Sequence, residues 1–306
     1  MRILVLGAGG IGGYYGARMH AAGGDVTFLV RPGRAGQLRE NGLKVFSPFG
    51  DLAITPKVVT ADALTESFDV IILTCKAYDL DSAMDAIAPA IGEQSVIIPL
   101  LNGVRHVDKL VKRFGAARVL GGVVLISATL TSTGEIHHLN KLHRFTVGSL
   151  GWRPSPWLEP LSKLMESSGV DFVLADNIGQ AMWDKIVFLT TLAGATCLMR
   201  ASVGIIMGTL AGEKFVNGLL DECAATAEAN GRKLADTQLA VFRSMLTDRN
   251  SALVASMLRD VETNKPTEAD HILGDMIAWA ENKKLEVPLL RLAYSHLQAY
   301  ERRRQG

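Results

Sequence analysis

The sequence has few cysteines, and their arrangement does not suggest a disulfide framework or a thiolate metal site. Only Cys75, Cys197 and Cys223 occur among 306 residues. Their number is odd, and no pair has CxxC spacing. The apolar run at the N-terminus is too short and too rich in glycine for a secretory signal. These absences disfavour a secreted, disulfide-stapled protein and predict a cytoplasmic one.

The chain also lacks an excess of charge and a long hydrophobic run. It has 32 Lys and Arg against 31 Asp and Glu, a formal net charge of +1. Such a balance gives no electrostatic signature for nucleic acid or an anionic membrane, so neither partner is expected. The apolar stretch at residues 186–199 is shorter than the roughly 20 residues that span a bilayer. It predicts a buried helix.

Short apolar runs alternate with helical patterns through the first half of the chain. Strands are predicted at residues 2–6, 25–30, 43–46, 52–59, 69–74, 95–100 and 118–126, and helices at 80–91 and 104–114. A helix follows the first glycine-rich segment, and a loop is predicted around residues 31–36. This alternation predicts an α/β fold with a Rossmann-type doubly wound sheet.

The pattern changes after residue 135. Two hairpin-like strands are predicted within residues 135–148, then a helix at 156–168 and a last strand at 171–174. Beyond residue 177 the periodicity is helical, including one helix predicted across residues 241–262. A chain of 306 residues favours two domains. We expect a Rossmann-type domain at residues 1–176 and an all-helical domain at 177–306.

A GxGxxG motif lies between the first strand and the first helix. Glycine is needed there because a tight turn and a close approach to a pyrophosphate leave no room for a Cβ, while the helix N-terminus supplies amide donors. The strand and helix on either side make the motif far more specific than its letters, although a plain tight turn is the alternative. The cofactor-binding residues expected here are Gly7, Ala8, Gly9, Gly10, Ile11 and Gly12.

The residue after the second strand indicates which dinucleotide is bound. An NAD site usually offers an acidic residue to the ribose 2′-hydroxyl, whereas here Arg31 follows the strand and Arg34 lies close behind. A guanidinium matches a 2′-phosphate and cannot accept a hydroxyl proton. The position therefore predicts NADP(H), with a solvated loop arginine as the alternative.

Two further polar residues follow buried strands at their carboxyl ends. Lys76 follows the strand at residues 69–74, and Asn102 follows the strand at 95–100. Ligands of open α/β sheets bind outside these ends, so both are candidates for the same cleft. Either one could instead be an ordinary loop residue.

In the helical half, Lys185 lies near the start of the most apolar helix. It could be a lysine whose stem packs while its ammonium stays in water, or a cation that protonates a developing alkoxide. His137, His138 and His143 have no metal-ligand spacing, and we interpret them as structural or exposed.

Taken together, these motifs resemble the ketopantoate reductases (2-dehydropantoate 2-reductases), which are NADPH-dependent and combine a Rossmann domain with a helical domain. The similarity runs nearly end to end. It comprises GAGGIG at residues 7–12, LVR at Arg31, TCKAYD around Lys76, LLNGV around Asn102, SAT near Ala128, MWDK ending at Lys185, and SMLRDVETNKPTEADHI at residues 256–272. The last motif is the most specific, because a generic Rossmann protein does not require it.

The resemblance assigns roles to individual residues. It implies that Lys185 is the catalytic acid and that Glu268 holds this lysine and the ligands. Ser256 would contact the substrate carboxylate, and Asn102 would bridge cofactor and substrate. Ala128 would join the cofactor-binding residues. The implied reaction reduces a small 2-oxo acid, as in pantothenate biosynthesis. Because cofactor sites usually lie in clefts between domains, we also predict a cleft in which Lys76 and Asn102 lie opposite Lys185.

One departure from the family pattern bears on the substrate. Where pantoate-forming members usually carry asparagines, this chain has Leu189, Ala193 and Val203. Three hypotheses stay open: a ketopantoate reductase, a paralogous NADP-dependent dehydrogenase with a less polar substrate, and a non-catalytic NADP(H) sensor. A sensor would not need both Lys185 and Glu268, so their presence favours an enzyme. The oligomeric state, a homodimer included, is left open.

Overall fold

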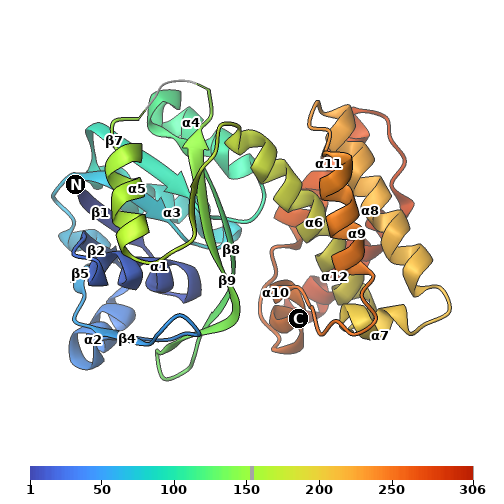
Figure 1. Cartoon of the computed structure of the whole chain (residues 1–306), viewed down its shortest axis with the longest axis horizontal. Coiled ribbons are helices and arrows are strands. Elements are labelled where there is room, and N and C mark those ends of the chain that lie inside the picture. The colour runs from blue at the N-terminus through green and yellow to red at the C-terminus, as the bar shows by residue number, and fades with distance from the viewer. Residues whose placement is uncertain (152–154, 306) are drawn as a thin grey trace. The chain divides into compact units, whose positions relative to one another are not determined.

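The computed structural model describes residues 1–151 and 155–305. They form two compact units, one of Met1–Leu101 with His106–Gly179 and one of Asn102–Arg105 with Gln180–Gly306 (Figure 1). The four residues Asn102–Arg105 thus belong with the helical unit, although they follow a strand of the first. The domain boundary predicted near residue 176 stays a prediction.

A parallel five-stranded sheet forms the centre of the first unit, in the order β5-β2-β1-β6-β7. All four pairings are parallel, because the connections are crossovers rather than hairpins. This order confirms the predicted Rossmann-type sheet. The strands are β1 (Arg2–Leu6), β2 (Asp25–Leu29), β5 (Lys57–Val59), β6 (Phe68–Leu73) and β7 (Ile91–Pro99).

A second sheet in the same unit was not predicted as a separate layer. Its order is β10-β9-β3-β4, with β8 paired to β9, and its strands are β3 (Leu43–Phe46), β4 (Leu52–Ile54), β8 (Leu120–Leu130), β9 (Ile136–Ser149) and β10 (Phe172–Leu174). The prediction of two strands within residues 135–148 was wrong, because β9 is continuous. The Asn140 side chain accepts a hydrogen bond from the Ser127 amide at the point where the β8–β9 register shifts. This bond connects the two strands where the regular backbone pairing is interrupted.

Helix α1 packs between the two sheets of this unit. Two glycines allow the helix backbone to pack closely against both sheets, because a Cβ on Gly16 would meet the Phe28 ring of β2 and one on Gly13 would meet Ile136 of β9. Tyr14 and Tyr15 fill the space beyond these contacts and are fully buried. The helices of the unit are α1 (Gly10–Ala21), α2 (Pro32–Asn41), α3 (Leu80–Ile87), α4 (Arg105–Phe114) and α5 (Leu158–Ser167), with 3₁₀ turns η1 (Ala61–Ala63), η2 (Ala77–Asp79), η3 (Ala88–Ala90) and η4 (Ala116–Arg118).

The loop predicted around residues 31–36 is the beginning of α2. Arg31 is the extended N-cap, and Pro32 takes the first helical position, where its missing amide costs nothing. Ala35 and Leu38 are buried on the inner face. The glycines of this segment suggested a loop, but the segment forms a helix that begins with a proline and is stabilised by tertiary packing.

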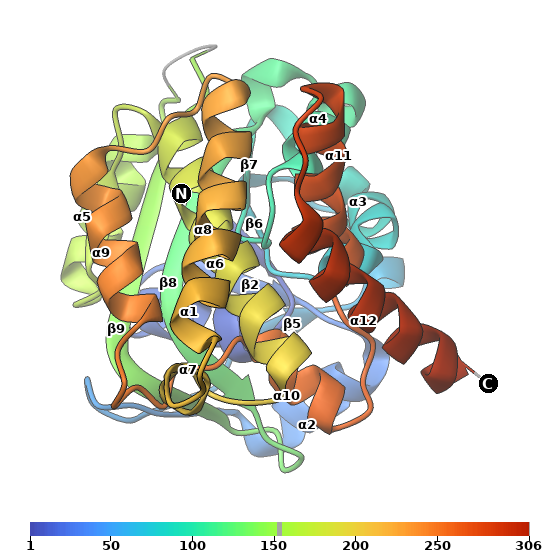
Figure 2. The same ribbon diagram turned by 90° about the vertical axis from the view of Figure 1, so that its right-hand side faces the viewer.

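The second unit consists of helices, which Figure 2 also shows, and its buried apolar side chains form one core. Its helices are α6 (Ile178–Met199), α7 (Val203–Met207), α8 (Gly212–Ala229), α9 (Asp236–Leu246), α10 (Ser256–Glu262), the π-helical turn η5 (Asp270–Gly274), α11 (Asp275–Asn282) and α12 (Pro288–Gln305). The helix predicted across residues 241–262 is interrupted between α9 and α10. There the Asp248 carboxylate accepts the Asn250 amide, a local bond that competes with helix continuation.

Helix α6 is 22 residues long, longer than the 14-residue apolar run at 186–199 suggested. Within the part of the chain that the structure describes, α6 is the one helix whose length and apolar composition would allow it to cross a membrane. Core helices of globular proteins pass the same test, and 61% of its most apolar window is buried. Ile186, Val187 and Ala193 belong to the core of the helical unit, as predicted for a buried helix.

Candidate cofactor and active site

The glycine motif forms a tight turn between β1 and α1. Gly7 has φ +98°, which favours glycine, and its amide donates to the Leu29 carbonyl at 2.9 Å. Gly12 lies against the Gly7 carbonyl and Thr74 Oγ1, so no Cβ fits there. Gly9 caps the helix, and no atom lies within 4 Å of the place where its Cβ would be. A turn that is packed on one side and open at its second glycine can receive a pyrophosphate.

Two neighbouring segments border this turn. The Ala128 carbonyl of β8 lies 2.6 Å from the place where a Cβ on Gly10 would be. Thr74, which follows β6, donates its hydroxyl to the Leu6 carbonyl at 2.7 Å. The structure thus brings Ala128 next to the glycine turn, together with Thr74, which sequence reasoning missed. The polar residue ending the apolar run at 69–74 was the available signal.

The two arginines after β2 differ in their surroundings. Arg34 donates to the Ala8 carbonyl at 3.0 Å and to Gln37 Oε1 at 2.5 Å, and burial lowers its pKa. It therefore stabilises the glycine turn. The Arg31 side chain is 82% exposed and forms an ion pair with Asp79, Nη2 to Oδ2 3.2 Å.

Lys76 lies where the sequence placed it, at the end of β6. It is half-buried and caps η2, and its carbonyl accepts the Asp79 amide at 2.9 Å. Asp79 was also missed, although it stands in the quoted TCKAYD motif. The role of Lys76 toward a ligand stays a prediction.

The helical unit brings Asn102, Lys185 and Glu268 together. Asn102 Nδ2 donates to Glu268 Oε2 at 3.3 Å, and Glu268 is buried with 4% of its surface exposed. The pKa of Lys185 is lowered to about 8, because the lowering effect of burial outweighs the raising effect of the Glu268 charge. A lysine with this pKa carries an exchangeable proton close to neutral pH. Glu268 opposes the loss of that proton.

A π-helical turn fixes the segment that follows Glu268. The turn η5 is a π-helical segment, and Thr190 of α6, fully buried, donates its hydroxyl to the Ile272 carbonyl of this turn at 3.3 Å. Gly103 has φ +90°, and a Cβ on it would be 3.0 Å from the His271 carbonyl. Thr190 lies on the same helix as Lys185. The turn is thus attached both to the lysine's helix and to the segment that carries Asn102.

The remaining candidate positions lie in different environments. Ala193 and Val203 are buried in the core of the helical unit, whereas Leu189 is half-buried one turn after Lys185. Ser256 is exposed as the first residue of α10. Its role, and the predicted cleft with Lys76 and Asn102 opposite Lys185, stay predictions.

Two histidines of the first unit, His138 and His143, are hydrogen-bonded to neighbouring side chains. His143 Nδ1 is hydrogen-bonded to the Tyr14 hydroxyl at 2.8 Å, and His138 Nδ1 to Ser47 Oγ at 3.0 Å. Burial lowers the pKa of His143. Across residues 1–151 and 155–305, no group of three or more His, Cys, Asp or Glu side chains is placed to hold a metal ion.

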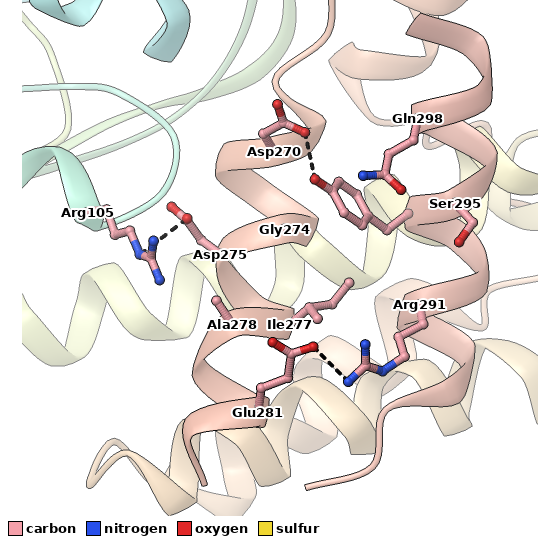
Figure 3. Close-up of a pocket in the computed structure, with 11 residues that line it drawn as sticks. Arg105, Asp270, Gly274, Asp275, Ile277, Ala278, Glu281, Arg291, Ser295 and Gln298 are labelled. Atoms are coloured by element: carbon pink, nitrogen blue, oxygen red, sulfur yellow. Dashed lines mark hydrogen bonds and ion pairs between the residues drawn. The ribbon is translucent and has the colours of Figure 1, made fainter. Parts of the chain in front are cut away.

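A pocket of about 520 Å³ on the helical unit involves none of the candidate residues (Figure 3). Its charged side chains pair with each other: Arg105 Nε with Asp275 Oδ1 at 3.2 Å, and Arg291 Nη2 with Glu281 Oε1 at 2.8 Å. The Tyr294 hydroxyl donates to Asp270 at 2.7 Å. Such internal pairing gives no indication of a ligand.

Two family models match the chain. "Ketopantoate reductase PanE/ApbA" matches residues 3–152, and "Ketopantoate reductase PanE/ApbA C terminal" matches residues 177–301. The chain belongs to the ketopantoate reductase family. It is accordingly an oxidoreductase of that family, as its motifs predicted.

Individual relatives show how broad the family is. An uncharacterized oxidoreductase, YkpB of Bacillus subtilis, is 37% identical over 98% of this chain and 99% of its own length. The 2-dehydropantoate 2-reductase of a Nostoc species is 23% identical over 96% of this chain and 93% of its own. The solved 2-dehydropantoate 2-reductase of Geobacter metallireducens has a TM-score of 0.90 at 28% identity, covering 98% of this chain and 99% of its own. The ketopantoate reductase fold is thus confirmed.

Proposed function

We propose that this protein is an NADPH-dependent reductase of a small 2-oxo acid, ketopantoate or a less polar relative, with Lys185 as its general acid. The observation that carries the proposal is the group of Lys185, Glu268 and Asn102 in the helical unit. The low pKa of Lys185 matches the task of a proton donor near neutral pH. A sensor would have no need of this arrangement, and we set that alternative aside.

The glycine turn fits a dinucleotide. Its space at Gly9 and the helix N-terminus behind it suit a pyrophosphate, and Arg31 suits a 2′-phosphate. The chemistry that bound NADPH supplies is hydride donation to the 2-oxo carbon. Lys185 then has the task of protonating the carbonyl oxygen as it becomes an alkoxide, and its charge stabilises that oxygen.

Glu268 and Asn102 act on the position and charge of Lys185. The carboxylate keeps the ammonium protonated against the effect of burial. Asn102 donates to the same carboxylate, which holds it in one orientation. We infer that Asn102 also contacts the ligands and that Ser256 binds the substrate carboxylate.

The apolar residues on α6 favour the less polar substrate. A site that hydrogen-bonds a substrate hydroxyl discriminates strongly by that bond, and Leu189 cannot form it. The family fold also carries a D-mandelate dehydrogenase, which was solved with NADH and anilino(oxo)acetate and is 22% identical with a TM-score of 0.90. Steady-state kinetics with NADPH against branched and aromatic 2-oxo acids, ketopantoate included, test the proposal directly. If the enzyme reduced none of these 2-oxo acids, the proposed function would be refuted.

The rate of reduction should depend on the protonation of Lys185. With a pKa of about 8, the lysine is an acid below that pH and loses its proton above it. We expect kcat to be level below about pH 7 and to fall roughly tenfold per pH unit well above pH 8. A kcat profile at saturating substrate checks this, and a level profile up to pH 10 would contradict it.

Leu189→Asn should move selectivity toward ketopantoate. An amide at this half-buried position can bond to a substrate hydroxyl, which we expect to raise the kcat/KM ratio of ketopantoate to a less polar 2-oxo acid by roughly tenfold. Ala193→Asn is a poorer test, because this fully buried site would hold an amide among apolar neighbours. An unchanged ratio in a folded Leu189→Asn variant would show that the position does not line the pocket.

Arg31→Ala should erode the preference for NADPH. We expect the unmodified protein to bind NADPH at least about tenfold more tightly than NADH, and the variant to lose this difference with little change for NADH. Fluorescence titration of both cofactors measures it. Equal affinities in the unmodified protein would refute the assignment of Arg31 to the 2′-phosphate.

The cellular setting follows from the same proposal. We place the enzyme in the cytoplasm and, with ketopantoate as substrate, in pantothenate biosynthesis. A ketopantoate reductase from Staphylococcus aureus with the same fold, at a TM-score of 0.83 and 22% identity, is described as dimeric. We propose a homodimer for this chain too, and sedimentation equilibrium tests it.

A further inference from the structure

Arg31, the arginine assigned to the 2′-phosphate of the cofactor, forms an ion pair with an acidic residue, Asp79. Arg31 Nη2 is 3.2 Å from Asp79 Oδ2, and no such partner was expected from the sequence. Arg31 is the N-cap of α2, two residues after the end of β2, whereas Asp79 ends the 3₁₀ turn η2 after β6. The two residues therefore come from separate crossovers of the parallel sheet.

Sheet order places this pair across the end of β1. Strands β2 and β6 both flank β1, so with a strand spacing of about 4.8 Å their ends are about 10 Å apart. The glycine turn starts at the end of β1 and contacts both neighbours, because Gly7 bonds to Leu29 and packs on Thr74. An ion pair between the ends of β2 and β6 thus lies where a dinucleotide in this turn would have its ribose.

Arg34 cannot replace Arg31 without loss to the turn. Its guanidinium is half-buried and donates to the Ala8 carbonyl, inside the glycine motif. Of Arg31 and Arg34, Arg31 is therefore the one with an exposed guanidinium, and the carboxylate of Asp79 competes with any phosphate for it.

We propose that Asp79 is a specificity-determining residue that limits the discrimination between NADPH and NADH. This inference rests on the proposed function, since it requires a dinucleotide in the glycine turn. When the ligand has a 2′-phosphate, the Asp79 carboxylate opposes it by charge and holds part of the Arg31 guanidinium. When the ligand has a 2′-hydroxyl, the same carboxylate is an acceptor of the kind that NAD sites use.

Because Arg31 and Asp79 are exposed, Arg31 can leave its ion pair with Asp79 and bind a phosphate instead. Asp79 is 36% exposed and Arg31 far more, so water screens their attraction, and breaking it costs little. Arg31 can then turn to a phosphate while Asp79 stays beside it. We infer that NADH is an accepted cofactor, and that the preference for NADPH is smaller than Arg31 alone would give.

Equilibrium binding to the Asp79→Asn variant tests the inference. Asparagine keeps the shape and removes the charge, so NADPH should bind about five- to tenfold more tightly and NADH about two- to fivefold more weakly. The matched control is Asp81→Asn, which removes the same charge two residues on, where Asp81 pairs with Lys109 at 3.2 Å. The control should leave the ratio of the two affinities unchanged.

Smaller probes locate the effect. Adenosine 2′,5′-bisphosphate and AMP differ only in the 2′-phosphate, so Asp79→Asn should change their affinity ratio as it changes that of NADPH to NADH. In an Arg31→Ala background, the gain in NADPH affinity from Asp79→Asn should shrink, because the competition for the guanidinium is gone.

The outcomes separate this inference from the proposed function. An unchanged ratio of NADPH to NADH affinity in Asp79→Asn, with both cofactors bound, overturns the role of Asp79 and leaves the reductase proposal intact. A ratio that shifts equally in Asp81→Asn also overturns it, because the effect is then one of general charge. No binding of either dinucleotide by the unmodified protein defeats the proposed function itself.

Discussion

Replacing Lys185 with alanine is expected to reduce kcat by about 10²- to 10⁴-fold, the usual contribution of a general acid. The loss should appear in kcat and kcat/KM alike, because the proton donor is assigned to the transition state rather than to ground-state binding. NADPH binding should survive, because the glycine turn belongs to the other unit. Steady-state kinetics measure kcat and kcat/KM, and a cofactor titration on the same preparation measures NADPH affinity.

Lys233→Ala is the matched control for this variant. Lys233 lies in the same unit and forms an exposed ion pair with Glu228 at 3.2 Å, so its removal deletes a lysine without touching the buried group. Its kcat should stay within about twofold of the unmodified enzyme, as for other exposed ion pairs. Near-normal kcat in Lys185→Ala would end the mechanism proposed here, whatever the fold.

Replacing Glu268 with glutamine should reduce turnover by about tenfold or more near neutral pH, through the lysine. The Glu268 charge raises the pKa of Lys185, and burial lowers it. Without the charge only the lowering effect remains, so the pKa must fall below about 8. The fall in kcat with rising pH should therefore begin at a lower pH in the variant, and an amide that can still bond to Asn102 limits the structural damage.

The shift of the profile distinguishes this role from a loss of stability. Asp275→Asn is the control, because Asp275 is also a buried carboxylate of the helical unit and forms an ion pair with Arg105. That variant should keep the pH at which kcat begins to fall. A Glu268→Gln enzyme with reduced kcat but an unshifted profile would mean that Glu268 does not control the proton on Lys185.

Local patterns predicted those parts of the fold whose residues determine their own conformation. The continuous apolar runs of β1 and β6 and the glycine turn were identified because both follow from short segments. Helix α2 and the unbroken β9 were not, because packing decides them. Ala35 and Leu38 bury one face of a glycine-containing helix, and the β8 partner keeps Asn140 within a strand.

The candidate site divides in the same way. The positions of Arg31 and Lys76 followed from strand ends, but the grouping of Lys185 with Glu268 came from the family resemblance, since no periodicity links residues so far apart. Asp79 and Thr190 were missed because their effects depend on partners in other elements, Arg31 and the Ile272 carbonyl. A sequence shows which residue types are present, but not which of them compete for the same group.

The most direct test of the central claim is the transfer of a labelled hydride. The enzyme would be incubated with NADPH deuterated at the transferable C4 position and the best 2-oxo acid of the kinetic panel, and the product analysed by mass spectrometry and NMR. The account predicts a 2-hydroxy acid with deuterium on C2, formed by the unmodified enzyme and at a rate reduced by about 10²-fold or more by Lys185→Ala. A product without deuterium on C2, or the same rate of labelling in the variant, would contradict it.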